Sequence, residues 1–216
     1  MRNKNIYIFA THFIDTNKMT EKNILNQEII LDINKTIVSK TDTKGIIEYA
    51  NDYFQEISGY TEKELLGQPH NIIRHPDMPK VVFKKLWEAL KMGRDIRVAV
   101  KNLAKDGRYY WVITNFFIVK DELGNITGYY ARRKNLPKHI KVIVEDLYKK
   151  LITIEKEAGM EVAEQYLASY LEGFNTCLND FVEYLFGEDK EMIEAYLKRE
   201  ITDKDILDFE KTLNLK

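Results

Sequence analysis

Hydrophobic and polar residues follow both strand-like and helix-like patterns in the first part of the chain. Residues 36–50 hold two runs rich in β-branched and other apolar residues, "TIVSKTD" and "IIEYA", separated by turn residues that end at Gly45. Two such runs around a glycine turn predict a β-hairpin. From residue 51 to residue 67 the apolar residues recur at helical spacing, and Gly59 and Gly67 stand where helices would end. We therefore expect a hairpin followed by two short helices.

An amphipathic helix and three further strands are expected next. In residues 80–93 apolar side chains recur on one side of a helix and lysines on the other, and Gly93 ends the pattern. Residues 95–133 contain three strand-like runs joined by Asp106-Gly107 and by a loop around Gly124, both of which have hairpin turn chemistry. The sequence therefore predicts an α+β fold, with a five-stranded antiparallel sheet, helices on one face and an α-helical C-terminal region.

After Pro137 the pattern is helical only. Apolar residues recur at steps of four and three over two heptads, at Ile140, Val144, Leu147, Leu151 and Ile154. This seam predicts either a helix that joins two copies of the chain through residues 138–156, or a helix that packs on its own chain. A second periodic run includes Cys177, which we therefore expect in an apolar core. The predicted units are an N-terminal tail or helix (1–34), a sheet domain (35–134) and a helical region (135–216).

Composition and charge exclude several classes of protein. No apolar run is long enough for a membrane span, and the N-terminus is too polar for a secretory signal, so we expect a cytoplasmic location without membrane insertion. A single cysteine excludes an internal disulfide and a cysteine-ligated metal cluster. Up to Lys141 the chain has 24 basic and 16 acidic residues, and after it 9 and 18. This asymmetry predicts either two units with different surfaces or two complementary faces of one molecule.

Catalytic and nucleic-acid-binding signatures are missing from the sequence. It has no phosphate-binding glycine loop, no G-x-G-x-x-G and no recognisable Ser-His-Asp set, so we do not expect an enzyme. The expected helix over residues 80–93 has a lysine stripe at Lys80, Lys84, Lys85 and Lys91. Because no aromatic residues are interleaved on that face, the stripe indicates a solvated helix face rather than a nucleic-acid interface.

Residues 67–79, "GQPHNIIRHPDMP", hold three of the four prolines of the chain together with several polar side chains. A proline restricts both itself and the residue before it, so this loop is expected to be rigid and to position side chains well. One helical turn fits between Pro69 and Pro76, which would bring His70 near Arg74. Arg74 is the candidate for binding an anion, and the alternative is an ion pair with Asp77 or a glutamate.

The histidines of this loop have less specific interpretations. His70 and His75 contact a ligand, or they only satisfy backbone groups. A metal site that combines His75 and Asp77 with His70 or His139 is disfavoured, because His-X-Asp spacing is common by chance and no second shell supports it. We therefore predict no metal site.

Strand alternation singles out Asn115. In "YYWVITNFF", Trp111, Ile113 and Asn115 share one face of the expected strand. An amide among apolar neighbours is the arrangement of a residue that orients a ligand, and the alternative is a hydrogen bond to a neighbouring loop. Asn102 is less informative, because it lies near the end of its strand.

The residues from "IIEYANDYFQEISGYTEKELLGQPHNIIRHPDMPKVVFKKLWEALKMG" to "VKNLAKDGRYYWV" resemble a PAS domain, and specifically the FAD-binding PAS domain of Aer-type aerotaxis and energy-taxis receptors. The resemblance covers roughly residues 35–134. "SGYTEKELLG" and "KDGRYYW" are general PAS features, whereas "GQPHNIIRHPDMP" matches several distinct side chains in order without a gap.

The resemblance implies FAD on the concave side of the sheet, with its redox state as the signal. The helices after Pro137 would relay that signal to a separate partner, such as a chemoreceptor-type transducer, or serve dimerisation. Carried over by position, the family's flavin-site residues are Asn51, His70, Arg74, His75, Asp77, Trp87, Asn102 and Asn115. The chain departs from the family at Ile96 and Val98, where the family usually has tryptophan and glycine. A valine that faces the cofactor would narrow the pocket.

Two alternatives to a flavin sensor follow from the same residues. One is a ligand-free PAS interaction module, in which Val98 takes the place of the cofactor. The other is a PAS sensor for haem or another small ligand. A photoreceptor that forms a cysteine adduct with flavin is excluded, because Cys177 lies in the C-terminal region and not in the loop beside the flavin.

Overall fold

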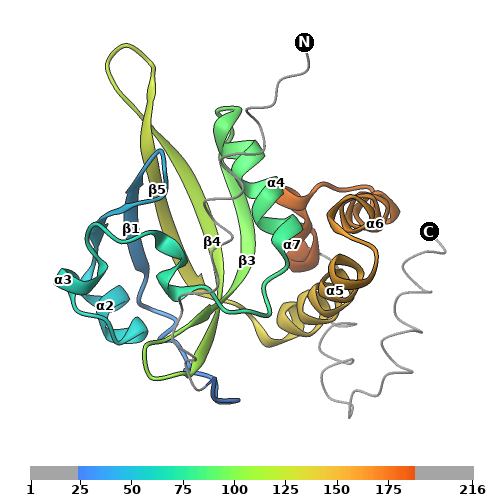
Figure 1. Cartoon of the computed structure of the whole chain (residues 1–216), viewed down its shortest axis with the longest axis horizontal. Helices are drawn as coiled ribbons and strands as arrows, with labels where there is room; N and C mark the ends of the chain where they lie inside the picture. Colours follow the sequence, from blue (N-terminus) through green and yellow to red (C-terminus); the bar gives the residue numbers. More distant parts are fainter. Residues whose placement is uncertain (1–23, 188–216) are drawn as a thin grey trace.

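The computed structural model describes residues 24–187, and its centre is a five-stranded antiparallel sheet. The strands are β1 (Ile37–Asp42), β2 (Ile47–Ala50), β3 (Ile96–Leu103), β4 (Tyr109–Lys120) and β5 (Ile126–Asn135). Their order across the sheet is β2-β1-β5-β4-β3 (Figure 1). The first hairpin therefore pairs with the last strand, β5, in the middle of the sheet. The predicted fold class is confirmed.

Four helical segments connect β2 to β3. They are α2 (Asp52–Ser58), α3 (Glu62–Leu65), the 3₁₀ helix η2 (His70–Ile73) and α4 (Lys80–Lys91). Helix α2 ends at Gly59, which has φ 71°. A Cβ added at this position would lie 3.5 Å from the Cβ of Lys105. Since φ in this region is costly for residues with a side chain, the glycine fixes where the helix stops. Helix α4 buries Val82, Leu86 and Leu90 against the sheet and neighbouring helices.

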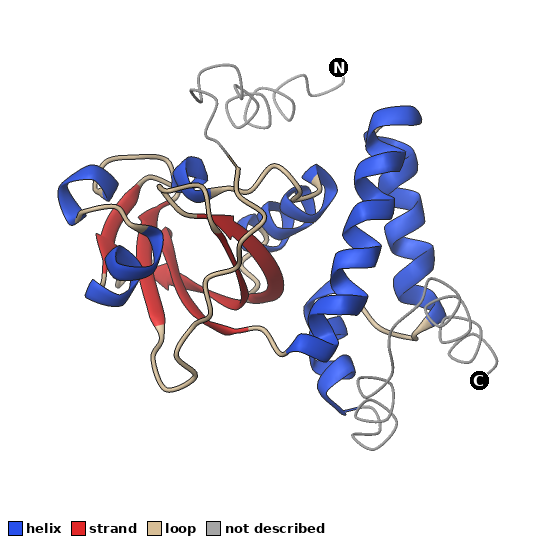
Figure 2. Cartoon of the chain, turned by 90° about the horizontal axis from the view of Figure 1, so that it is seen from below, coloured by secondary structure: helices blue, strands red, loops and turns tan. Residues whose placement is uncertain are grey.

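The C-terminal helices α5 (Lys138–Glu157), α6 (Met160–Gly173) and α7 (Leu178–Gly187) pack at the β3 side of the sheet, where they contact β3 and α4. Figure 2 shows the two long helices beside the strands and not among them. The Tyr148 hydroxyl of α5 donates to the carbonyl of Ala99 at 2.7 Å, and the rings of Tyr148 and Trp111 lie 6.0 Å apart. Ala99 of β3 and Trp111 of β4 are therefore buried beneath α5, whereas Arg132 and Lys134 of β5 are exposed on the same face of the sheet.

The heptad seam of α5 is used within the chain. Ile140, Val144, Leu147 and Leu151 are all buried in the described structure. The periodicity left open a helix packed on its own chain, and that is the packing found here. Among residues 24–187, no helix is both long and apolar enough to cross a membrane.

The prediction of a core position for Cys177 is wrong, because Cys177 is exposed. Helix α6 ends at Gly173, and Asn175 has a positive φ of 51° that breaks the helical periodicity. Cys177 immediately precedes α7, and its carbonyl accepts from the backbone N–H groups of Asp180 and Phe181. The prediction extended one helical pattern of apolar residues through Cys177. That pattern did not indicate the turn between α6 and α7.

Candidate ligand pocket

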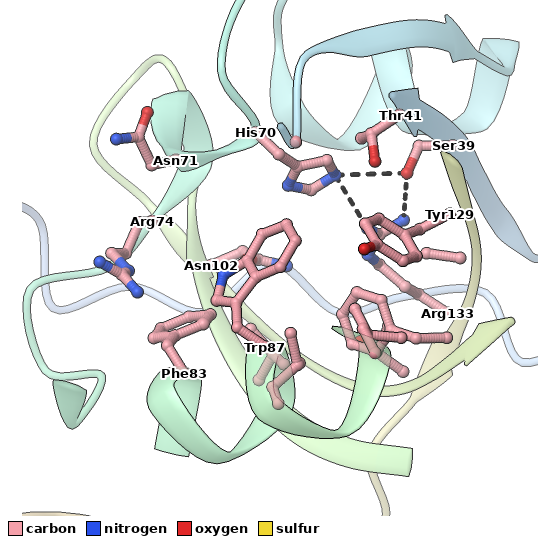
Figure 3. A pocket seen from close by; sticks show the side chains of 17 residues that line it. Ser39, Thr41, His70, Asn71, Arg74, Phe83, Trp87, Asn102, Tyr129 and Arg133 are labelled. Atoms are coloured by element: carbon pink, nitrogen blue, oxygen red, sulfur yellow. Dashed lines mark hydrogen bonds between the residues drawn. The ribbon is translucent and has the colours of Figure 1, made fainter. Parts of the chain in front are cut away.

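A cavity of about 70 Å³ lies between α4 and the sheet, beside η2 (Figure 3). The side chains from α4 that line it are Phe83, Leu86, Trp87 and Leu90. The polar side chains that line it are Ser39, Thr41, His70, Asn71, Arg74, Asn102, Thr114 and Arg133. Most of the wall is apolar, so the polar groups stand out as a small set that converges on one space. This combination is typical of a ligand site.

Arg133 of β5 is a buried cation in the pocket wall. Its side chain is 2 % exposed, and its two terminal nitrogens donate to Ser39 Oγ at 2.9 Å and to His70 Nε2 at 2.8 Å. Its guanidinium also lies 5.7 Å from the centre of the Phe54 ring. Burial lowers the pKa of Arg133 to about 10, so the group stays charged at neutral pH. Within the described chain none of these partners is a carboxylate, which leaves the positive charge available to a ligand.

His70 is held neutral beside this cation (Figure 3). Because guanidinium nitrogens only donate, Nε2 of His70 must accept, and the ring proton is on Nδ1. Burial, followed by the positive charge of Arg133, lowers the pKa of His70 to about 3. The ring also stacks on Phe54 with centroids 5.7 Å apart. His70 therefore positions Arg133 and lines the cavity as a neutral group.

Asn102 and Thr114 present buried polar atoms that have no partner. Asn102 on β3 is 4 % exposed and Thr114 on β4 is fully buried. The Asn102 Nδ2 and the Thr114 Oγ1 make no hydrogen bond in the structure, and both residues line the cavity. A buried polar atom without a partner is destabilising, so both atoms indicate a place where a ligand or water supplies the missing bond.

Arg74 and Trp87 occupy the side of the pocket nearest to α4. The Arg74 guanidinium lies 3.6 Å from the centre of the Phe83 ring, a cation–π contact. Burial lowers the pKa of Arg74 to about 10, and the charge of Glu155 opposes that shift. The indole of Trp87 meets the ring of Tyr129 edge to face at 5.6 Å. The structure thus brings His70, Arg74, Trp87 and Asn102 together around one cavity.

His75 and Asp77 do not line this cavity. Asp77 accepts a hydrogen bond from the buried Lys101 Nζ at 2.7 Å, so the alternative pairing of Asp77 with Arg74 is wrong. Burial raises the pKa of Asp77, but the hydrogen bond and charge of Lys101 outweigh it and the pKa is lowered. Burial and then Lys101 lower the pKa of His75 to about 4. Within residues 24–187 no group of three metal-ligating side chains is present.

Asn51 lies outside the pocket and holds secondary structure together. Its amide oxygen accepts from the backbone N–H of Val38 at 2.9 Å and of Phe54 at 3.1 Å, and its nitrogen donates to the Thr36 carbonyl at 2.9 Å. It is the N-cap of α2 and joins that helix to β1. Its side-chain oxygen and nitrogen both bond to the backbone, which explains its identity without a ligand.

Asn115 also lies outside the pocket, on the other face of β4. Strand alternation correctly groups it with Trp111, but that face packs under the C-terminal helices. Its side-chain oxygen accepts from Arg97 Nε at 2.6 Å. The pocket-facing residue of this part of β4 is Thr114. The structure places Asn115 on the face of β4 away from the cavity. Because Trp111 on that face is also buried, apolar neighbours did not identify the pocket side.

The two positions that depart from the family pattern lie on the pocket face of β3. Val98 is fully buried and stands opposite Thr114, and Ile96 is 5 % exposed and stands opposite Phe116. Neither side chain lines the cavity itself. They fill the space between the sheet and α4 at one end of the pocket.

Sequence reasoning missed Arg133, Ser39 and Thr114. For Arg133 a signal was available, since Tyr129, Ala131 and Arg133 alternate along β5 and the first two are apolar. An arginine at the next position of an otherwise apolar strand face is unusual, and it could have been recognised from the sequence. Its partner Ser39 comes from β1, and only the β1–β5 pairing brings the two together.

Part of the chain is similar in sequence to known proteins. Residues 47–131 match the family model described as PAS fold. Over 116 residues the chain is 46 % identical to the aerotaxis receptor of Escherichia coli, covering 54 % of this chain and 23 % of the receptor. The bacterioopsin transcriptional activator of Halobacterium salinarum is 25 % identical over 161 residues, covering 74 % of this chain and 22 % of that protein. A solved light-oxygen-voltage domain is 22 % identical with a TM-score of 0.46, covering 57 % of this chain and 88 % of that one.

The chain spans about a quarter of the length of these curated relatives, 23 % and 22 %. The matched region contains the whole pocket loop, residues 67–79, together with α4 and strands β3 to β5 up to Ala131. The sheet and the helices between β2 and β3 are therefore a PAS domain, similar in sequence to a segment of the aerotaxis receptor.

Proposed function

We propose that this PAS domain is a signal-transduction sensor that binds FAD in the cavity between α4 and the sheet, and that the redox state of the flavin is its signal. The observation that carries the proposal is the buried, carboxylate-free Arg133, together with the partnerless Asn102 Nδ2 and Thr114 Oγ1 in the same cavity. The flavin ring offers carbonyl oxygens and ring nitrogens, which suit donors of this kind. When bound, FAD would supply a reversible redox centre.

The donor set fits a flavin, whereas the cavity volume requires an adjustment of α4. Pockets that enclose ligands of drug size are about 300–1,000 Å³, and this cavity is about 70 Å³. Phe83 and Trp87 are the large, half-buried side chains on the α4 side of the space. FAD binding therefore needs these side chains to move away from the sheet.

The small cavity is also the observation that favours a second function. In a ligand-free PAS interaction module, Val98 and the α4 side chains fill the core, and the remaining space holds water bonded to Asn102 and Thr114. Haem or another small ligand is a third occupant. The absorption spectrum separates the three, since flavin bands, a Soret band and a colourless folded protein are distinct outcomes.

The signal would pass to a separate protein. The relatives named above include a receptor and a transcriptional activator, and a nitrogen fixation regulatory protein of Klebsiella pneumoniae is 27 % identical over 99 residues. We propose a signalling partner such as a chemoreceptor-type transducer, reached through the helices after Pro137. We propose a non-catalytic role, in which the pocket groups bind and orient a ligand.

The proposal is tested by reconstituting the protein with FAD and titrating the Arg133→Met variant beside it. Wild type should show flavin bands after removal of free FAD. The variant should stay folded and bind FAD about tenfold or more weakly, because a hydrogen bond to a charged group is worth about 1.5–3 kcal/mol. Arg132→Met is the matched control, since Arg132 is exposed on the same strand. A folded wild type without flavin bands would exclude the FAD proposal, and equal affinity in Arg133→Met would remove Arg133 from the site.

A further inference from the structure

Helix α4 belongs to the pocket and to the C-terminal helices at the same time. Its side chains Phe83 and Trp87 line the cavity. From the other side of the helix, Lys84 and Lys85 both form ion pairs with Glu164 of α6. Figure 1 shows α4 between the sheet and the C-terminal helices. A movement of the pocket wall formed by α4 would therefore also move the surface of α4 that contacts α6.

The N-terminus of α4 is capped by a residue of α5. Helix α4 begins after Pro79, which has no side chain able to accept a hydrogen bond from the first free N–H groups. Glu155 takes that role, since its Oε1 accepts from the backbone N–H of Val81 at 2.7 Å. A carboxylate is favoured here, because the N-terminus of a helix carries a partial positive charge. The last turns of α5 and the first turn of α4 are thus joined by one half-buried side chain.

Arg74 stands on the pocket side of the same junction. Its guanidinium rests on the ring of Phe83, two residues after Val81. The negative charge of Glu155 acts on Arg74 across this junction and raises its pKa against the effect of burial. The carboxylate of Glu155, near the end of α5, therefore interacts both with the start of α4 and with Arg74 in the cavity wall.

We propose that Glu155 couples occupancy of the pocket to the position of α5, so that the C-terminal helices respond to the ligand through this side chain. The inference rests on the proposed function, because FAD fits only if Phe83 and Trp87 move. When Phe83 moves, the first turn of α4 and Arg74 move with it, and the Glu155 carboxylate must follow or release the Val81 N–H. By linkage, the helices in turn alter the affinity of the pocket for its ligand.

The first test is hydrogen exchange of the full chain with and without FAD. In wild type, FAD should change exchange of the amides in residues 151–157 by about fivefold or more, the lower end of typical coupling between sites. In Glu155→Ala, FAD should still bind while this response is lost. Glu155→Gln keeps an acceptor for Val81 and should restore part of it. Glu157→Ala is the matched control, because Glu157 is exposed on the same helix, and it should respond as wild type does.

The second test needs no ligand. Phe83→Leu replaces the aromatic ring under Arg74 with a smaller side chain. It should accelerate hydrogen exchange of the amides in residues 151–157. The same substitution made in Glu155→Ala should leave those residues unchanged relative to Glu155→Ala alone, as expected for a coupled pair. An effect of Phe83→Leu that is confined to α4, or that persists in full without Glu155, would overturn the inference.

The two proposals fail in different ways. A folded wild type that does not bind FAD would remove the proposed function, and the ligand-free test would then decide the coupling. A wild type that binds FAD without any change in α5 would leave the proposed function in place and exclude the coupling through Glu155.

Discussion

At the scale of single residues, the pocket is defined by which polar groups have partners and which do not. Arg133 is bonded to two neutral groups, Ser39 and His70, and keeps its charge. By contrast, the buried Lys101 has the carboxylate of Asp77 as its partner and makes a closed ion pair. Both cations are buried, but a carboxylate compensates the charge of Lys101 and none compensates the charge of Arg133 among these partners. Of these two cations, Arg133 lines the cavity, so its charge has a physical reason to attract a ligand.

The neutral state of His70 predicts a pH dependence of stability. Its pKa is about 3 in the folded chain and 6.5 ordinarily, so the unfolded chain binds a proton that the folded chain excludes. This contribution is complete above about pH 6.5 and is lost as the pH falls from there toward about 3. The free energy of unfolding of wild type should therefore fall between pH 7 and pH 5 by about 2 kcal/mol more than that of His70→Gln.

Urea titrations of both proteins at the two pH values measure this difference. The glutamine can still accept from Arg133, so the variant should fold. His75, whose pKa is lowered to about 4, contributes a similar slope to both proteins and cancels in the comparison. Equal pH dependence in wild type and His70→Gln would show that His70 titrates normally.

At the scale of elements, short helices in this domain depend on side chains that tie them to strands. Helix α2 has only seven residues, and an isolated helix of that length is unstable in water. The three hydrogen bonds of Asn51 connect its first turn to β1 and to the segment that precedes β1. The amide of Asn51 therefore helps to fix the position of α2 against the sheet. The structure places this residue, which the resemblance implied for the ligand site, outside the cavity.

Asn51→Ala should destabilise the protein without weakening the ligand site directly. The loss of the N-cap and of the bond to Val38 should lower the free energy of unfolding by about 2 kcal/mol, measured by urea denaturation. Asn51→Asp retains both acceptor bonds and loses only the bond to Thr36, so its loss should be smaller. For the fraction that remains folded, FAD affinity should match wild type. A large loss of affinity in stable, folded Asn51→Asp would instead place Asn51 at the ligand.

At the scale of the whole molecule, the PAS sheet and the C-terminal helices share a core. Leu151 of α5 is fully buried, and Tyr148 of the same helix bonds to the carbonyl of Ala99 on β3. On the edge of the sheet, the backbone N–H of Arg97 donates to Asn179 Oδ1 at 2.7 Å, so α7 partly covers the edge strand. A structure joined in this way should unfold as one cooperative unit.

Leu151→Ala tests that cooperativity. Removal of a fully buried leucine side chain should cost about 2–5 kcal/mol, whereas Val162→Ala on the exposed face of α6 should cost about 0.5 kcal/mol or less. Tryptophan fluorescence reports on Trp87 and Trp111 in the PAS domain, and far-ultraviolet circular dichroism reports mostly on the helices. Both signals should shift to lower urea together. Two separate transitions, with only the dichroism affected by Leu151→Ala, would mean that the helices form an independent unit.

The candidate site was predicted less completely than the fold. The loop of residues 67–79 placed His70 and Arg74 at the cavity, because prolines restrict the backbone locally and a short helical turn between them is a local event. The resemblance added Trp87 and Asn102. The partners of these groups come from distant strands: Ser39 from β1, Thr114 from β4 and Arg133 from β5. No local sequence pattern indicates which strands will be neighbours in the sheet.

The sequence by itself determined the strands and helices of the sheet domain, because those depend on local physics. The glycine turns at Gly45, Gly107 and Gly124 adopt positive φ, and the hairpins predicted around them are present. The tertiary structure alone decided which face of β4 lines the cavity, and it placed Asn115 outside and Thr114 inside. Alternation sorts residues into two faces, but β4 has buried apolar neighbours on both of them. Only the packing of α4 on one side and α5 on the other distinguishes them.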